Sequence, residues 1–589
     1  MKKQGALFTL TLIIIISVFA IIFFGHKKEG YHIDELYSYG LANSEYLPFM
    51  HFGVSGYDVK DWMLEYGAGE NFGDLFSNLK KDFHILKDSD FNFYNTEIYH
   101  AYCIAQANSA DTYTSTWVPG QDYVDYLAVS DSNTFNYASV YYNQRGDVHP
   151  PLFYMLLHTI CSMFQGMFSK WFGIGLNIAI SVITLLVLYK MCVKHFGEKR
   201  LAIVILMTYA FSCGFITTAL FIRMYALLTL MTLLCCYAHL ELQRNDFEMT
   251  RKIGLGLFLS VLGGYYTQYY FVLYAIGIAT VMVVNLIYRQ KWKSLIKYIS
   301  VLASAAAVGI VIWPFSLKHV FAGYRGQASL QVFIEGNFVL YNAKVMLDNI
   351  WGNMFGGKGG IFLGVMIVSA LICILMKKKI FYGKVCLIVL PVVGYALIVG
   401  QISPFLADRY VMCTYPFWCI FFVGAVYAAG ICLLERVCKK EWPASTFSRL
   451  RMAVLLLCGL ILVCSNNFVT HIPGYLFTGG QETYELPENT DCLYVLPNGT
   501  WNETAEYTNI LAKCNRVGIV YESNVELLAE DYGKEAGDYL VVMIGSGLDE
   551  SSILERVRES FHVEDMKEIR RDQTGNVLRI LLGNKNINF

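Results

Sequence analysis

The sequence predicts a polytopic α-helical membrane protein, and three observations carry this prediction. Of its 589 residues, 55% are hydrophobic and only 16% are charged. The hydrophobic residues gather in runs of about 17 to 25, which is the length that crosses a bilayer as a helix. Basic residues concentrate in short segments between these runs, whereas acidic residues collect in two long polar regions. This pattern excludes a soluble globular protein, and the formal net charge of -1 gives no reason to expect nucleic acid as a partner.

The first hydrophobic run, at about 7–24, follows two N-terminal lysines. It resembles a signal sequence, but it is long for a signal core and no small-residue cleavage site follows it. We therefore expect an uncleaved first transmembrane helix in residues 1–25, with the N-terminus in the cytoplasm. A polar, tyrosine-rich segment comes next, so we expect residues 26–170 to form a long extracytoplasmic loop with juxtamembrane helices.

The remaining hydrophobic runs set the topology through their number and the charges between them. They lie near 151–168, 171–193, 201–221, 215–240, 253–270, 271–288, 298–315, 361–376, 385–401, 411–434 and 452–469. If 151–168 lies along the outer surface as an interfacial helix, all five basic clusters fall in the cytoplasm; if it crosses, all five fall outside. The clusters are Lys190, Lys194, Lys199 and Arg200; Arg244, Arg251 and Lys252; Arg289, Lys291, Lys293 and Lys297; Lys377, Lys378, Lys379 and Lys384; and Arg436, Lys439, Lys440, Arg449 and Arg451. The positive-inside rule thus predicts about eleven transmembrane helices, with a helical region at 171–470.

The same count places the C-terminal region, residues 471–589, outside the cytoplasm. Four apolar runs there have the length of strands, and the stretches between them read as helices, so we expect a small extracytoplasmic α/β domain. The runs are 492–496, 517–521, 539–544 and 577–582. Most of the sixteen cysteines lie inside the apolar runs as small hydrophobic residues, whereas Cys492 and Cys514 can form a disulfide if this domain is extracytoplasmic.

Four groups of polar residues lie at the expected outer ends of membrane helices. They are Asp34 and Glu35 in His32-Ile33-Asp34-Glu35; Asp147 and His149 before two prolines; Arg223 and Tyr225; and Arg409 and Tyr410 after Asp408. Each has an ordinary structural explanation: a solvated acidic loop, a helix start, an arginine that reaches the interface, and an internal Asp408–Arg409 ion pair. Burying an unpaired arginine in a membrane costs about 2.5 to 3.5 kcal/mol or more, so Arg223 should meet an anion or reach the outer interface.

One apparent motif is discarded. Gly352 to Lys358 fits the spacing of a phosphate-binding loop, but Gly359 replaces the residue that would hold magnesium and no strand precedes the segment. We expect a flexible loop there. No spacing typical of a zinc site is found, so no metal ligands are assigned.

Taken in order, the four groups resemble the motifs of the GT-C class of polytopic glycosyltransferases. Within this class, the bacterial relatives of protein O-mannosyltransferases and of the lipid A aminoarabinose transferase are the most similar. The resemblance covers about residues 1–435. The chain departs from the family in its first outer loop, which is considerably longer, and in its C-terminal α/β domain, which has no counterpart.

The resemblance implies a GT-C fold and a site on the outer face of the cell membrane, where a sugar is transferred from a polyprenyl phosphate with inversion to an unknown extracytoplasmic acceptor. Asp34 is the expected base, because a sugar phosphate has a good leaving group and needs no general acid. Glu35 is expected to support Asp34, orient the acceptor or hold a divalent cation (Mg²⁺ or Mn²⁺), and no other cofactor is expected. Arg409, and secondly Arg223, would neutralise the phosphate.

The remaining site residues complete this picture. Tyr225 and Tyr410 would add hydrogen bonds to the donor, and Asp147 and His149 would shape the site beside Asp34. Two other function classes stay open. A transporter or flippase of an envelope glycolipid would carry ionisable residues near the bilayer midplane, whereas the candidate charges lie at the outer rim. An envelope scaffold would be indifferent to the loss of Asp34. The sequence names neither the sugar nor the acceptor.

Overall fold

The structure is a computed structural model that describes most of the chain. The described residues are 3–49, 59–66, 69, 71–111, 117–321, 323–335, 339–376, 382–437, 446, 449–450, 452–455, 459, 472–477, 486–498, 503–532, 539–563, 565–571 and 577–582. They form two compact units. The helical unit comprises residues 1–27, 173–316 and 328–476, and the mixed unit comprises 28–172, 317–327 and 477–589.

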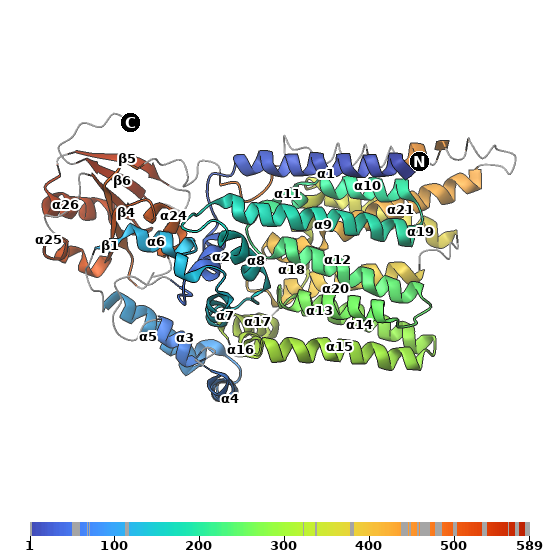
Figure 1. The fold of residues 1–589 in the computed structure, drawn as a ribbon, viewed down its shortest axis with the longest axis horizontal. Coiled ribbons are helices and arrows are strands. Elements are labelled where there is room, and N and C mark those ends of the chain that lie inside the picture. Colours follow the sequence, from blue (N-terminus) through green and yellow to red (C-terminus); the bar gives the residue numbers. More distant parts are fainter. Residues whose placement is uncertain are drawn as a thin grey trace. The chain divides into compact units, whose positions relative to one another are not determined.

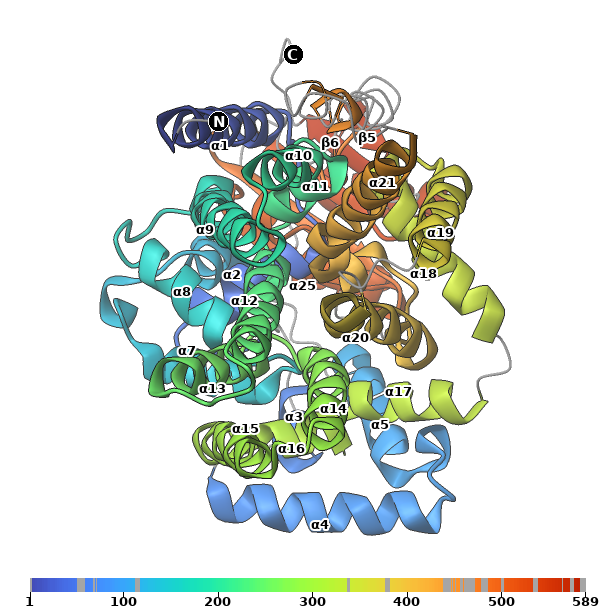
Figure 2. The same cartoon turned by 90° about the vertical axis from the view of Figure 1, so that its right-hand side faces the viewer.

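The helical unit contains the apolar helices. They are α1 (Lys3–His26), α9 (Lys170–Phe196), α10 (Lys199–Ala210), α11 (Cys213–Leu220), α12 (Tyr225–Arg244), α13 (Arg251–Tyr265), α14 (Phe271–Tyr288), α15 (Trp292–Ile312), α18 (Val339–Phe355), α19 (Gly359–Leu375), α20 (Tyr382–Ile402) and α21 (Tyr415–Val437), with the 3-10 helix η3 (Asp408–Thr414) before the last (Figure 1). Figure 2 shows these helices end-on, and neighbours include α12 with α13, α14 with α20, and α19 with α21.

Six of the described helices are long and apolar enough to cross a membrane, and eight do so if each of two bent helix pairs counts as one span. The bent pairs are α10 with α11, at 57°, and α18 with α19, at 91°. The first pair breaks where Ser212 accepts a hydrogen bond from the backbone of Phe215 and so caps a new helix. A multi-pass membrane protein is confirmed. The count of about eleven stays a prediction, and the run 452–469 lies mostly outside the described residues.

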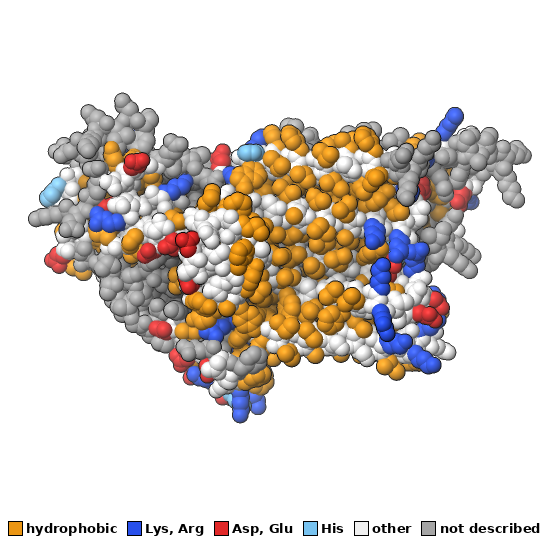
Figure 3. Space-filling model, in the orientation of Figure 1, with side chains coloured by type: hydrophobic (Ala, Val, Ile, Leu, Met, Phe, Trp, Pro, Cys, Tyr) orange, Lys and Arg blue, Asp and Glu red, His pale blue; other side chains and the backbone are white. Residues whose placement is uncertain are grey.

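Basic side chains gather at one end of the helical unit. The α9–α10, α12–α13 and α14–α15 connections lie at the same end as the N-terminus (Figure 1). Figure 3 shows Lys and Arg side chains at that end and hydrophobic side chains over the helices beside it. This is the arrangement that the positive-inside count requires, and the side of the membrane on which it lies stays a prediction. Lys377, Lys378, Lys379, Lys439, Lys440 and Arg451 lie outside the described residues.

The flexible loop predicted at Gly352 to Lys358 is wrong for its first four residues, and the last three form a turn. Residues 352–355 form the last turn of α18, in which Met354 and Phe355 are buried. Gly356 and Gly357, with φ of 61° and 76°, end the helix in the left-handed conformation that glycine adopts without strain. The buried apolar side chains of this turn pack in the core and so stabilise the end of α18.

The mixed unit combines the helices of the first long loop with a sheet. Its helices include α2 (Ile33–Asn43), α3 (Val59–Tyr66), α4 (Phe72–Asp88), η1 (Phe93–Asn95), α5 (Glu97–Asp111), α6 (Gly120–Leu127), η2 (Asp131–Asn133), α7 (Tyr137–Gly146) and α8 (Leu152–Cys161). The short α16 (Phe315–Phe321) and α17 (Tyr324–Glu335) follow α15, and each is divided between the two units. The helix α8 occupies part of the run predicted to be interfacial, and its ten residues are fewer than a span requires.

The sheet has six strands in the order β1-β3-β2-β4-β6-β5. They are β1 (Val118–Pro119), β2 (Thr490–Leu496), β3 (Arg516–Tyr521), β4 (Tyr539–Ile544), β5 (Asp565–Arg571) and β6 (Val577–Leu582). The strand β2 pairs in parallel with β3 and β4, and the other pairings are antiparallel. The four apolar runs of the C-terminal region are thus strands. The sequence analysis missed β5, which is mostly polar, and β1, which comes from the first loop.

Helices cover both faces of this sheet. One face packs on α25 (Leu528–Asp531) and α26 (Glu550–Phe561), with η5 (Glu522–Leu527) beside them. On the other face, Tyr494 of β2 packs against Tyr507, which precedes α24 (Thr508–Leu511). The helix α24 follows α23 (Glu503–Glu506) and contacts α6 of the first loop. The backbone N–H of Gly120 donates to the carbonyl of Asn515 at 2.9 Å. The first loop and the C-terminal region therefore fold together, although the sequence analysis treats them as separate domains.

Candidate functional site

The segment around Asp34 forms the N-terminus of α2. His32 is the N-cap, and its Nδ1 accepts a hydrogen bond from the backbone N–H of Asp34 at 3.0 Å. In return, Oε2 of Glu35 accepts one from the backbone N–H of His32 at 2.7 Å. These two bonds make a capping box, which satisfies backbone donors that the first helical turn leaves open. The acidic pair is therefore a helix start, and a solvated loop is not what the structure shows.

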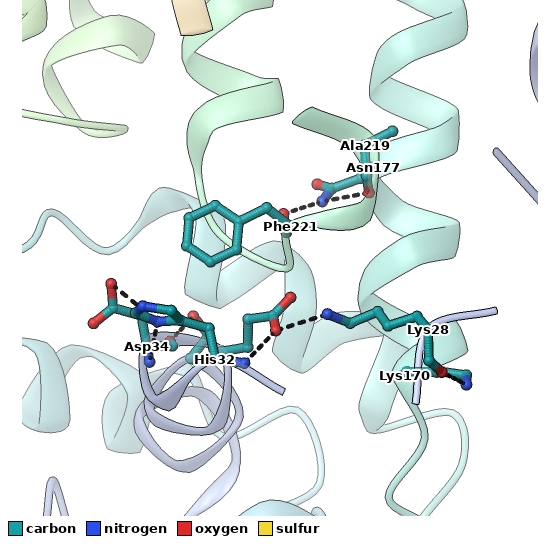
Figure 4. A network of polar contacts seen from close by, with 9 residues as sticks. Lys28, His32, Asp34, Lys170, Asn177, Ala219 and Phe221 are labelled. Carbon is teal, nitrogen blue, oxygen red and sulfur yellow. Dashed lines mark hydrogen bonds and ion pairs between the residues drawn. The ribbon is translucent and has the colours of Figure 1, made fainter. Parts of the chain in front are cut away.

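Glu35 is occupied by structural contacts. Its side chain and that of Lys28 are fully buried, and Nζ of Lys28 donates to Oε2 of Glu35 at 2.9 Å. The same ammonium lies 5.0 Å from the ring centre of Phe477. Figure 4 shows Lys28 with its backbone carbonyl bonded to Lys170, and with His32 and Asp34 nearby. A buried charge of this kind needs its partner, so the Lys28–Glu35 pair stabilises the start of α2.

Of the two adjacent carboxylates, Asp34 is the one whose side chain is partly exposed. Its side chain is 25% exposed, against 0% for Glu35. One of its oxygens lies 3.6 Å from Nδ1 of His32. Within this pair, only Asp34 is accessible from the surface, and its role as the base stays a prediction.

The helix α2 is held firmly by its neighbours in the mixed unit. It packs against α6, α7 and α8. The hydroxyl of Tyr39 donates to the carbonyl of Ser169 at 2.7 Å, and the side chain of Asn43 donates to the carbonyl of Leu127 at 2.7 Å. A Cβ at Gly40 would lie 2.0 Å from the ring of Tyr126, so only glycine admits this approach of α6.

Asp147 and His149 form a second acidic and basic pair near α2. Nδ1 of His149 lies 2.7 Å from Oδ2 of Asp147, and both side chains are mostly buried. This contact favours the tautomer that carries hydrogen on Nδ1. Asp147 and Tyr37 of α2 both lie near Tyr126, whose pKa burial raises well above its usual value. The pair therefore belongs to the packing around α2, and its expected role in shaping a site beside Asp34 stays a prediction.

Arg223 and Tyr225 lie where α11 ends and α12 begins, in the helical unit. Both side chains are buried, at 3% and 2% exposure. The side chain of Asn177 donates to the carbonyls of Ala219 and Phe221, at 3.2 and 2.8 Å, and fixes the segment before Arg223 (Figure 4). These carbonyls lie at the end of α11, where intrahelical donors run out.

Asp408, Arg409 and Tyr410 begin η3. Oδ1 of Asp408 accepts from the hydroxyl of Tyr475 at 3.0 Å, and Oδ2 accepts from the side chain of Asn353 at 3.3 Å. The guanidinium of Arg409 lies 5.4 Å from the ring centre of Tyr410. Asp408 thus orders this segment through residues from two other parts of the chain.

The two arginine-bearing segments meet in one aromatic cluster of the helical unit. The ring of Tyr475 stacks on that of Phe221 with centres 3.9 Å apart, and Phe221 stacks on Tyr225 at 5.6 Å. Tyr410 contacts Tyr225 edge to face at 6.5 Å and Tyr270 at 5.4 Å. Segments that are far apart in the sequence are therefore side by side at this point.

Tyr475 and Phe477 contact the candidate residues and were not predicted from the sequence. Tyr475 joins the arginine segments in the helical unit, whereas Phe477 lies 6.4 Å from the ring of His32 in the mixed unit. Both have positive φ, 61° and 48°, which costs a bulky residue energy and is found at functional sites. The only signal in the sequence is the pair of aromatic residues shortly after the last hydrophobic run.

The structure thus brings the predicted residues together in two groups. Arg223, Tyr225, Arg409 and Tyr410 belong to the helical unit, and Asp34, Glu35, Asp147 and His149 belong to the mixed unit. Among the described residues, no group of three or more His, Cys, Asp or Glu side chains could hold a metal ion. A requirement for Mg²⁺ or Mn²⁺ stays an untested prediction.

Comparisons with known proteins give a limited result. No family model and no curated protein matches the sequence. The structure is similar to that of ArnT from Cupriavidus metallidurans bound to undecaprenyl phosphate, at 12% identity and a TM-score of 0.43, over 74% of this chain and 89% of that chain. The apo state of the same protein gives 13% identity and a TM-score of 0.41 over the same shares. Similarity at these scores assigns no residue a role.

Proposed function

We propose that this chain is a glycosyltransferase of the GT-C type, which moves a sugar from a polyprenyl phosphate to an acceptor on the outer face of the membrane. The observation that carries the proposal is the meeting of the Arg223 and Arg409 segments in one aromatic cluster. Two arginine-bearing segments that meet beside the ends of apolar helices suit a phosphate whose lipid tail stays in the bilayer. The motif order described above points to the same class of enzyme.

The arginines have a defined task in this reaction. As the bond between the sugar and the phosphate breaks, negative charge grows on the leaving phosphate. Hydrogen bonds to charged groups contribute about 1.5 to 3 kcal/mol each, and they strengthen as this charge develops. Arg409 and Arg223 would supply these bonds, and the hydroxyls of Tyr225 and Tyr410 would add neutral ones.

Asp34 would act as the base. It takes the proton of the acceptor hydroxyl while the acceptor oxygen bonds to the anomeric carbon and the phosphate departs with the bonding electrons. One displacement inverts the anomeric centre. Glu35 holds α2 in place through Lys28, and Asp147 and His149 shape the surface beside it.

A transporter of an envelope glycolipid is the second candidate. The two bent helix pairs favour it, because interrupted helices line the substrate path in many transporters. A transporter needs no base at the surface, so the loss of the Asp34 carboxylate distinguishes the two functions.

The test compares envelope glycans by mass spectrometry in cells that lack the protein, carry it, or carry Asp34→Asn. We expect a glycan that depends on the protein and that falls about 10² to 10⁴-fold in the variant, since a general base contributes that much. The control is Asp131→Asn, which removes an exposed carboxylate of the same unit. Membrane level and thermal stability should match in all three proteins. Full activity of Asp34→Asn would refute the role of the base, and an unchanged glycan profile would refute the transferase.

A further inference from the structure

The helix α4 carries an exposed stripe of alternating aromatic and basic residues. Phe76 and Phe83 are each 54% exposed. Lys80, which lies between them in the sequence, and Lys87, which follows them, are also exposed. At 100° per residue, these four side chains fall within about 60° of one another around the helix. The aromatic residue Phe91, just beyond the helix, is also exposed.

A different face of α4 is buried and fixes the helix to the mixed unit. Leu75, Asp82 and Leu86 are at most 2% exposed. The side chain of Asp82 pairs with Nζ of Lys318 in α16, and both are buried. Burial raises the pKa of Asp82 to about 6 and lowers that of Lys318, so removing both groups from water is costly. The orientation of the stripe is therefore set by a buried ion pair.

Lys318, which pairs with Asp82, lies in a segment next to α15, a candidate membrane span. Lys318 follows Ile312, the last residue of α15, by six positions, which is at most about 20 Å of extended chain. Val320 and Phe321 in the same short helix are 41% and 64% exposed. An apolar surface beside a span is expected to lie against lipid.

A second segment next to a span shows the same property. Met163, Phe164 and Met167 are 64%, 46% and 55% exposed, and they directly precede α9. Over the described part of 486–569, by contrast, Leu527 is the one large hydrophobic side chain that is exposed. Exposed apolar groups of the mixed unit are therefore found in the first loop and beside spans, and are almost missing from the sheet region.

We propose that α4 is an interfacial helix that lies on the membrane surface and binds anionic phospholipids. Phe76 and Phe83 enter the boundary between headgroups and acyl chains, and Lys80 and Lys87 contact lipid phosphates. Amphipathic helices of this composition bind in this manner, and the attraction to anionic lipid depends on the lysines. The proposal does not depend on sugar transfer.

The test measures hydrogen exchange by mass spectrometry on the full-length protein in nanodiscs. One set contains phosphatidylcholine alone and the other adds phosphatidylglycerol, with detergent micelles as a third condition. We expect the amides of 72–88 to exchange several-fold more slowly with phosphatidylglycerol than in micelles, and at an intermediate rate in phosphatidylcholine. Lys80→Glu with Lys87→Glu should remove the difference between the two lipids. Phe76→Ser with Phe83→Ser should remove protection in both.

The control is Lys513→Glu with Leu527→Ser, which combines one lysine-to-glutamate and one apolar-to-serine exchange on exposed positions of the sheet region. This variant should exchange like the wild type throughout 72–88. Equal exchange in micelles and in both lipids would overturn the proposal. Equal protection in the two lipids would overturn the part that concerns anionic headgroups. Protection in micelles that increases with protein concentration would indicate a second copy of the chain and would also overturn it.

Discussion

The hydroxyl of Tyr475 donates a hydrogen bond of 3.0 Å to Oδ1 of Asp408, which precedes it by 67 residues. The ring of Tyr475 stacks on Phe221 as well, so this residue connects both arginine-bearing segments. Burial, with Asp408 nearby, raises the pKa of Tyr475, and the hydroxyl is therefore a donor at neutral pH. The contact gives a direct test of the proposed phosphate site.

Tyr475→Phe removes this hydrogen bond and keeps the stacking. A hydrogen bond to a charged group contributes about 1.5 kcal/mol or more, so under the proposed function we expect the affinity for a polyprenyl phosphate to fall about tenfold as Arg409 loses its fixed neighbour. Tyr475→Ala should lower it further. The dissociation constant of the purified protein measures the effect, and Tyr266→Phe, a tyrosine bonded to the Val308 carbonyl, is the control. Unchanged affinity in Tyr475→Phe would show that the contact does not support the site.

Substitutions in the buried ion pair of Lys28 and Glu35 test whether Glu35 has a structural role that is distinct from the proposed catalytic role of Asp34. Glu35→Gln or Lys28→Met leaves one buried charge without its partner, which costs about 3 to 5 kcal/mol. The double variant removes both charges and should recover most of this loss. Thermal unfolding of the purified protein measures the effect, and Asp34→Asn should unfold like the wild type. If Glu35→Gln proves as stable as Asp34→Asn, Glu35 does not have the supporting role assigned here.

These residues show how far the sequence could lead. The membrane imposes a length and a charge rule on each apolar run, so α9, α12 and α15 follow from local patterns. The capping box of α2 was missed because histidine is not a usual N-cap residue. Its recognition would have separated the roles of Asp34 and Glu35.

Contacts between distant segments were beyond the sequence analysis. The sequence around Tyr475 does not predict its hydrogen bond to Asp408, because this contact forms only when the helices pack. The strand β1 has only two residues, and it joins the sheet by pairing with β3, which lies in the C-terminal region. Single-sequence patterns report local preference, whereas these features arise from tertiary structure.

A substitution at Gly120 tests the packing of the first loop against the C-terminal sheet. A Cβ at this position would lie 1.7 Å from the carbonyl oxygen of Cys514, which is backbone and has little room to move. Gly120→Ala should therefore separate α6 from the sheet and lower the thermal unfolding midpoint by several degrees. Gly175→Ala is the matched control, because its Cβ meets nothing within 4 Å and alanine favours the helix. Equal midpoints for the two variants would contradict this packing.

His319 gives the mixed unit a sensitivity to acid. Burial lowers its pKa to about 4, whereas the hydrogen bond to the Arg145 carbonyl and the charge of Asp147 oppose this shift, and His149 and Lys318 add smaller effects in the direction of burial. At neutral pH the ring is uncharged, and its Nε2 lies 3.0 Å from the carbonyl of Arg145, where it donates a hydrogen bond. An unfolded histidine takes up a proton near pH 6.5.

Between pH 6.5 and 4 the unfolded chain therefore binds a proton that the folded chain does not, and stability falls as the pH falls. The full effect is about 3 kcal/mol at pH 4. Asp82 acts in the opposite direction, because its raised pKa lets the folded state bind a proton first as the pH falls through about 6. His319→Gln keeps a donor for the Arg145 carbonyl and does not titrate, so it isolates the histidine. Unfolding midpoints at pH 7, 6 and 5 should fall less steeply in this variant than in the wild type, and parallel curves would rule out His319 as the acid-sensitive group.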